Sequence, residues 1–426
     1  MPADLTDPVS SAGRPPAGRP APGPTVLSRL TGTDATTFGT EYWARRPLLA
    51  RGADPDGFRD LLDLDGVDEL LSRRGLRTPF IRLARDGAVV DSASFTGGGG
   101  VGAEITDQVR DDRVAALFAA GHTVVLQALH RTWPPVLELS TRLTAELGHP
   151  VQANAYVTPP SARGFSAHYD VHDVFVLQLA GRKHWTVHEP VHPDPLRNQP
   201  WSDHAAAVAA RADTDPPAVD TVLEPGDVLY LPRGWLHAAT ALGAVSAHLT
   251  IGVHVVTRFA LVEAMLAAVA GHHELRASLP LGIDVADPAA LAPHLDAVRD
   301  ALAEALQQVG PEEIARRVRG RVWDGGRPEP VRPVSGAAFL DGLSVGDSVR
   351  LRIGLHHRLV TEAGRLRLQL PDREITFPTV VEPALRALLG PGSRSVGDLP
   401  GLDEADQLVL VRRLLREGVL IPASHP

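Results

Sequence analysis

The chain of 426 residues is long enough for two or three domains with full hydrophobic cores. Its 44% hydrophobic and 22% charged residues are typical of a globular protein, and the net charge of -9 argues against a broad nucleic-acid-binding surface. The absence of Cys excludes disulfides, thiolate metal sites and cysteine nucleophiles, which leaves His, Asp and Glu as metal ligands. Neither a leader-like start nor an apolar run of membrane-spanning length is present, so we expect a cytoplasmic protein that does not contact a membrane.

The N-terminal part of the chain predicts a tail followed by a layer of helices and strands. Residues 1–24 are rich in Pro, Ala and Gly, and we expect them to be a disordered tail. Apolar spacing, turn residues and capping residues then predict the following elements: an amphipathic helix over 58–75, a hairpin over 78–90, a helix before Gly121, a strand over 122–129 and a helix over 134–148. These elements are typical of a layer that packs against a barrel.

A strand is predicted over residues 152–156, and Thr158-Pro159-Pro160 ends it. Asn154 and Tyr156 alternate onto one face of this strand. We interpret both as contacts to a bound cofactor or substrate. The alternative is that they fill the interior of a barrel.

His168 and Asp170 are the first two members of a predicted metal site. They stand two residues apart before an apolar, β-branched run, and a strand there would aim both side chains at one face. His237 follows the turn Pro232-Arg233-Gly234 and adds a second imidazole. Two neutral imidazoles and one carboxylate suit non-haem Fe(II) with open coordination positions. Because the chain contains 18 His, such a pair could also arise by chance, and the assignment depends on its context.

Lys183 is the single lysine of a chain that otherwise uses arginine. A strand over 173–179, a turn at 180–182 and a return strand from Lys183 predict a hairpin that brings the ammonium beside the metal ligands. A compact ammonium on a flexible stem suits the carboxylate of a ligand in a confined barrel. The alternative is a solvated charge at the end of a strand.

Three stretches carry a resemblance to a known family. Residues 226–237, GDVLYLPRGWLH, resemble the second motif of the cupin superfamily, although Ala241 stands where that motif has Asn. Together with residues 154–160 and 164–190, they resemble the Jumonji-C family of Fe(II)- and 2-oxoglutarate-dependent oxygenases. The likeness is greatest to the ribosomal oxygenase branch, whose members hydroxylate ribosomal proteins, and it covers residues 150–257.

The resemblance implies an α+β fold containing a double-stranded β-helix. It assigns His168, Asp170 and His237 as iron ligands and Lys183 as the residue that holds the distal carboxylate of 2-oxoglutarate. It also favours His237 over the competing His248 and His254 as third ligand. No side chain is expected to act as nucleophile or general base. Other His near the site lack ligand spacing and are read as surface or supporting groups: His172, His184, His188 and His192.

The chain beyond residue 257 predicts further domains. We expect an oxygenase domain over 25–257, a helical segment over 258–325, a linker over 326–336 and a winged-helix-like domain over 337–426. The resemblance implies that the helical segment forms a homodimer, while packing against the barrel is the alternative. Arg and acidic residues balance over 356–426, so we expect the last domain to bind protein or serve structure, with no direct DNA binding.

The sequence therefore predicts an oxygenase that hydroxylates a protein side chain, with His or Arg of a ribosomal protein as the leading substrate. Two alternatives remain at this point: an oxygenase acting on a small molecule or peptide natural product, and a non-catalytic metal-binding regulatory cupin. Lys183 and the complete set of ligands weigh against the regulatory protein. The triad alone is also compatible with removal of an N-methyl group.

Overall fold

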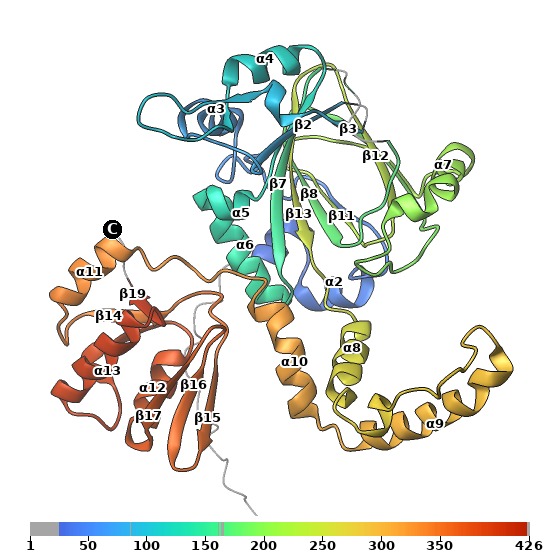
Figure 1. Ribbon diagram of the computed structural model, residues 1–426. Helices are drawn as coiled ribbons and strands as arrows, with labels where there is room; N and C mark the ends of the chain where they lie inside the picture. Colours follow the sequence, from blue (N-terminus) through green and yellow to red (C-terminus); the bar gives the residue numbers. More distant parts are fainter. Residues whose placement is uncertain (1–24, 86, 161, 163–165, 424–426) are drawn as a thin grey trace, which may run out of the picture.

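The structure is a computed structural model that describes residues 25–85, 87–160, 162 and 166–423. The expected tail over 1–24 lies outside the described residues. Figure 1 shows two sheets at the top of the molecule, a helical arm below them and a smaller C-terminal part beside the arm. The α+β class predicted from the sequence is confirmed.

Two antiparallel sheets form the upper part of the molecule. Within the described residues, each strand of the larger sheet is hydrogen-bonded to the next in the order β1 (Leu48–Ala50), β11 (Val228–Leu231), β8 (Asp173–Ala180), β13 (Ser246–Val253), β7 (Val151–Thr158), β6 (Thr123–Leu126), β2 (Ile81–Arg85) and β3 (Ala88–Val89). The smaller sheet has the order β10 (Val219–Leu223), β9 (Lys183–His188) and β12 (Leu236–Ala241). A short ribbon of β4 (Thr96–Gly97) and β5 (Gln108–Val109) lies apart from both.

Strand β8 shows how the two sheets share one core. Val174 and Val176 are buried between the sheets, together with Trp185 and Val187 of β9. The alternating residues of β8, such as Phe175, are buried in a second cluster on the other face of the larger sheet. Because β8 is covered on both faces, its sequence is a continuous apolar run and does not alternate.

Helices cover the outer face of the larger sheet. They are α1 (Val26–Thr31), α2 (Ala35–Glu41), α3 (Leu64–Arg73), α4 (Asp111–Ala119), α5 (Leu129–Thr132) and α6 (Pro134–Leu147), while α7 (Ala205–Thr214) follows β9. The predicted helix over 58–75 is shorter than expected. The Asp63 side chain accepts a hydrogen bond from the Gly66 N–H and caps the start of α3, while residues 58–61 form turns.

The predicted hairpin over 173–188 is wrong in one respect. Strands β8 and β9 follow each other across a short turn but belong to different sheets, β8 pairing with β11 and β13, and β9 with β10 and β12. Gly181 makes this crossing possible. Its φ is +61°, and a Cβ there would lie 2.1 Å from the carbonyl oxygen of Val245. The crossing places Lys183 on the sheet that faces β8.

The lower part of the molecule contains the arm and the C-terminal body (Figure 1). The arm consists of α8 (Arg258–Val269), α9 (Pro288–Gln307) and α10 (Pro311–Trp323). The body contains α11 (Pro333–Asp341), β14 (Ser348–Leu351), β15 (Arg358–Glu362), β16 (Arg365–Gln369), β17 (Glu374–Pro378), α12 (Glu382–Leu389), β18 (Ser393–Ser395), α13 (Glu404–Arg416) and β19 (Leu420–Pro422). Its strands form two small sheets, β18-β14-β19 and β15-β16-β17, around a separate apolar core. Helix α11 begins inside the range expected to be a linker.

The length and hydropathy of the helices show whether any of them could span a membrane. In the described part of the chain, none of the helices combines the length and the apolar character needed to cross a bilayer.

Candidate metal site

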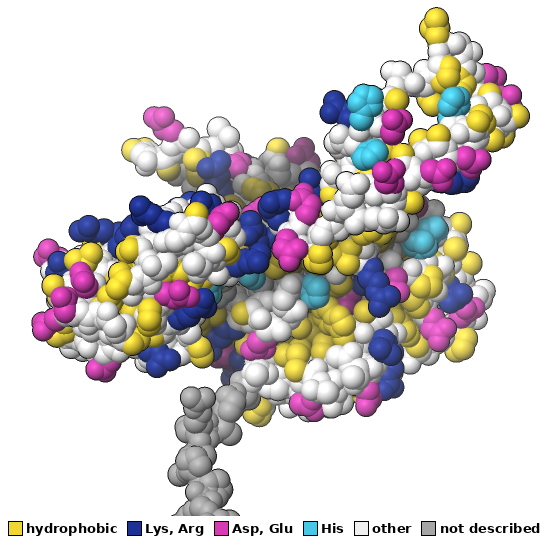
Figure 2. Space-filling view, turned by 90° about the horizontal axis from the view of Figure 1, so that it is seen from below, with side chains coloured by type: hydrophobic (Ala, Val, Ile, Leu, Met, Phe, Trp, Pro, Cys, Tyr) yellow, Lys and Arg dark blue, Asp and Glu magenta, His cyan; other side chains and the backbone are white. Residues whose placement is uncertain are grey.

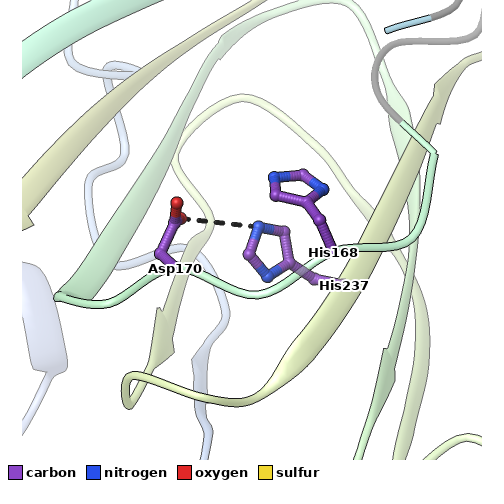
Figure 3. Close-up of side chains that lie close together, drawn as sticks. All are labelled: His168, Asp170 and His237. Atoms are coloured by element: carbon purple, nitrogen blue, oxygen red, sulfur yellow. Dashed lines mark ion pairs between the residues drawn. The ribbon is translucent and has the colours of Figure 1, made fainter. Parts of the chain in front are cut away.

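The three predicted ligands lie together at the open end of the two sheets. His168 precedes β8, and His237 is the second residue of β12. Their backbones form an isolated antiparallel bridge, in which the His237 N–H donates to the His168 carbonyl at 2.8 Å. Asp170 is close to both, and its Oδ2 is 3.7 Å from His237 Nε2 (Figure 3). One ligand atom from each side chain falls within 4.8 Å of the others.

The orientation of both imidazoles fits a metal ion. His168 Nδ1 is 2.8 Å from the Ser166 carbonyl oxygen, and His237 Nδ1 is 3.1 Å from the Trp235 carbonyl oxygen. A carbonyl can only accept, so Nδ1 carries the proton in each ring and donates it. Each Nε2 is therefore left with a lone pair, as a metal ligand requires. With one carboxylate, these two nitrogens form a facial set suited to Fe(II).

The charge states of the site also favour a cation. Burial and the adjacent His168 lower the pKa of His237 to about 4, so its ring is neutral at pH 7. Burial opposes ionisation of Asp170, but the nearby His172, His237 and His168 outweigh it and hold the pKa of the carboxyl below its ordinary value. The site thus presents the neutral imidazole of His237 and the negative charge of Asp170.

Lys183, the first residue of β9 in the smaller sheet, lines the same cavity as the triad. The cavity has a volume of about 80 Å³ and apolar walls that include Val174, Val176 and Trp185. Lys183 is 3% exposed, and its Nζ donates to Thr158 Oγ1 at 3.2 Å. Burial lowers the pKa of Lys183 to about 7. The alternative of a solvated strand-end charge is wrong.

The sequence of this chain is similar to those of several known proteins. A family model described as the JmjC domain matches residues 135–261, the range that contains the triad and Lys183. The chain carries a JmjC domain. A relative from Aedes aegypti, "Bifunctional lysine-specific demethylase and histidyl-hydroxylase NO66", is 30% identical over 258 residues, which are 59% of this chain and 39% of that protein. This chain therefore spans about two fifths of that relative's length.

A longer alignment joins the chain to "Ribosomal oxygenase 1" of Rattus norvegicus, at 27% identity over 437 residues, 90% of this chain and 70% of the rat protein. Among solved structures, the ribosomal oxygenase YcfD of Escherichia coli has a TM-score of 0.53 at 19% identity and covers 92% of this chain and 98% of its own. A structure of YcfD holds cobalt and 2-oxoglutarate, with a TM-score of 0.51. The JmjC domain here is homologous to those of the ribosomal oxygenases, and the YcfD likeness extends over the arm and the C-terminal body.

The two residues predicted on β7 have different surroundings within the JmjC domain. Tyr156 lines the cavity, and burial raises the pKa of its phenol, so the hydroxyl stays protonated at pH 7. Asn154 is not part of the cavity lining. Its Oδ1 accepts a hydrogen bond from the Ala128 N–H at 3.0 Å. This bond stabilises Ala128, which precedes α5 and has a left-handed backbone conformation.

Sequence reasoning missed two supporting groups in the JmjC domain. Thr158 was read only as the end of a strand, yet it is fully buried and receives the bond from Lys183. Arg82 on β2 forms a side-chain hydrogen bond with Tyr156 and helps to lower the pKa of Asp170. A signal for Arg82 is present in the sequence, because a charged residue stands between Ile81 and Leu83, which are both buried.

The competing imidazoles do not belong to the group of possible metal ligands. His248 is buried on β13 with its Nδ1 3.5 Å from Lys183 Nζ, and His254 follows β13 with its ring 5.4 Å from that of His172. Among the described residues, the group whose atoms could share a metal ion contains neither of them. The geometry therefore favours His237 as third ligand.

Proposed function

We propose that this protein is an Fe(II)- and 2-oxoglutarate-dependent oxygenase that hydroxylates a protein side chain. The observation that carries the proposal is one cavity lined by His168, Asp170, His237 and the only lysine of the chain. Relatives named as ribosomal oxygenase and histidyl-hydroxylase support a ribosomal protein as substrate and His as its target residue, with Arg as the alternative that the sequence predicts. No observation on the cavity favours a small-molecule substrate or a regulatory role.

The side chains have distinct tasks in this proposal. His168, Asp170 and His237 would hold the iron, and three protein ligands would leave coordination positions for the co-substrate and oxygen. Lys183 pairs with the distal carboxylate of 2-oxoglutarate in a charge-assisted hydrogen bond. Bound iron, 2-oxoglutarate and oxygen supply the oxidation, with release of succinate and carbon dioxide.

The walls of the cavity protect this chemistry. Val174, Val176 and Trp185 exclude water from the space between the triad and the lysine, which strengthens the ion pair that Lys183 makes. Tyr156 adds a protonated hydroxyl to the lining and can donate a hydrogen bond to a bound carboxylate or substrate. Asn154 contributes by fixing the neighbouring loop through Ala128.

Succinate formation tests the activity. Purified protein with Fe(II), ascorbate, oxygen and 2-oxoglutarate should produce succinate, and addition of ribosomal protein should increase the rate. The variant Lys183→Met should be inactive, while Arg182→Met, which removes the exposed neighbouring cation, should remain active. A product that gains one oxygen, located by mass spectrometry, identifies the target. Iron binding without succinate under any addition would contradict the proposal.

We further propose that the arm, residues 258–325, pairs with a second copy of the chain. Large apolar side chains of α8 are 42–49% exposed, and Figure 2 shows hydrophobic side chains along the arm. They are Phe259, Leu261, Val262 and Leu266. Exposed apolar faces of this kind are typical of interfaces. Light scattering of the wild type should give a dimer, and Leu266→Glu should give a folded monomer.

We also propose the remaining domain assignments that the sequence predicts. They are an oxygenase domain over 25–257, a linker over 326–336 and a winged-helix-like domain over 337–426. Helices α11, α12 and α13 beside the sheet β18-β14-β19 support the last assignment. Its balanced charge favours a protein-binding or structural role.

A further inference from the structure

His248 is a buried imidazole to which the proposed function gives no role. It is 4% exposed and lines the cavity. Its ring stacks on Tyr156, with centroids 5.0 Å apart and planes 3° apart, and meets Trp185 edge-on at 5.5 Å and 84°. These contacts fix the plane of the ring. A phenyl ring would fill the same space, so the polar atoms of His248 require a separate explanation.

The hydrogen bonds of Lys183 provide that explanation. An ammonium has three N–H donors. Among the described residues, its partners are Thr158 Oγ1 at 3.2 Å and His248 Nδ1 at 3.5 Å. Two donors are thus occupied by the protein, from two different strands of the larger sheet. The third donor is left for a group bound in the cavity, which Lys183 also lines.

We propose that His248 is a positioning residue for the co-substrate, because its Nδ1 holds the ammonium of Lys183 with the third N–H toward the distal carboxylate of 2-oxoglutarate. This inference rests on the proposed function, which supplies the co-substrate. Accepting a bond at Nδ1 places the proton of His248 on Nε2 and keeps the ring neutral. A neutral ring is required, since a second cation at this distance would repel the ammonium.

The electrostatics of the pair agree with this role. Burial and the charge of Lys183 hold the pKa of His248 well below its ordinary value, so the ring remains an acceptor at pH 7. If the ring only filled space, an acceptor atom directed at the ammonium would not be needed. The variant His248→Phe distinguishes a residue that only fills space from one that accepts a hydrogen bond from Lys183. Phenylalanine keeps the aromatic ring but lacks the acceptor nitrogen.

Binding of 2-oxoglutarate to protein loaded with Mn(II), measured by titration calorimetry, tests the proposal. His248→Phe should weaken binding by about tenfold or more, because a hydrogen bond to a charged group is lost. His248→Asn should stay within about threefold, since its amide oxygen replaces Nδ1 as acceptor. In the Lys183→Met background, His248→Phe should have no further effect. His184→Phe, on the same strand as Lys183 but paired with Asp220 outside the cavity, serves as control.

A second readout does not depend on the proposed function. Selective ¹³C labelling of lysine gives one side-chain resonance, because the chain has one lysine, and its pH titration reports the pKa of Lys183 directly. His248→Phe should lower that pKa and His248→Asn should restore it, since the acceptor stabilises the charged form. An unchanged pKa in His248→Phe would overturn the inference. If the wild type binds no 2-oxoglutarate but the pKa moves as expected, the co-substrate assignment fails while the positioning of Lys183 by His248 stands.

Discussion

The buried ammonium of Lys183 has a cost in stability that can be measured. Burial lowers its pKa from 10.5 to about 7. In the unfolded chain the side chain has its ordinary pKa, so between pH 7 and 10.5 the unfolded state binds more protons than the folded state. Stability therefore rises with pH through this window, and the cost of burying the lysine is greatest below pH 7.

The magnitude follows from the size of the shift. At about 1.4 kcal/mol per pKa unit, the cost is about 4 kcal/mol at pH 7 and about 1 kcal/mol at pH 10. Lys183→Met removes this cost and also loses the hydrogen bonds to Thr158 and His248. The uncharged amine can make the same two bonds, and any extra strength that they have with the ammonium is already contained in the pKa of Lys183, so they add no separate pH dependence. The free energy of unfolding of the wild type, minus that of the variant, should thus rise by about 3 kcal/mol from pH 7 to pH 10.

Urea unfolding of the wild type and Lys183→Met at the two pH values measures this difference, and the lysine resonance gives the pKa independently. Arg182→Met is the matched control, because it removes an exposed side chain next to Lys183 in the sequence, and its difference from the wild type should not change between the two pH values. A lysine resonance that titrates near pH 10, or a wild-type minus Lys183→Met difference that does not change with pH, would refute the reasoning.

Three further outcomes are expected. Asp170→Asn removes the only negative ligand and should weaken Mn(II) binding by at least about tenfold in titration calorimetry, whereas equal affinity would remove Asp170 from the site. Only protonated Lys183 pairs with a carboxylate, so the Kd of 2-oxoglutarate should increase as pH rises above about 7, and a constant Kd up to about pH 9 would contradict this. Gly181→Ala should lower the free energy of unfolding by about 2 kcal/mol or more in urea, because its Cβ would meet the carbonyl of Val245. Gly243→Ala, also at positive φ but in open space, should cost less, and equal costs would show that the contact is unimportant.

The predictable part of the site is the part encoded by residue type and spacing. His168, Asp170 and His237 were identified from the sequence because few side chains bind iron and their spacing matched a known pattern. Lys183 stood out because it is the single lysine. The structure brings these four residues to one cavity.

The features that the sequence does not predict depend on contacts between residues that are far apart in the chain. The two strands before and after Gly181 look like a hairpin locally, and only the packing of two sheets separates them. Likewise, Thr158 and His248 became partners of Lys183 because β7 and β13 pair and face β9 across the cavity. From a single sequence, a threonine and a histidine in apolar strands do not predict that both side chains contact the same lysine. The surroundings of Arg82 were hidden for the same reason.

The bridge between His168 and His237 has a thermodynamic consequence. It joins the segment entering the larger sheet to a strand of the smaller sheet, so an ion held by both side chains would link the two layers as well as support chemistry. Any ligand that binds only the folded state adds to stability, by about 2.7 kcal/mol when its free concentration is a hundred times its Kd. A metal ion bound by this set would therefore stabilise the folded protein as well as serve the proposed activity, and removal of the metal by a chelator should lower both.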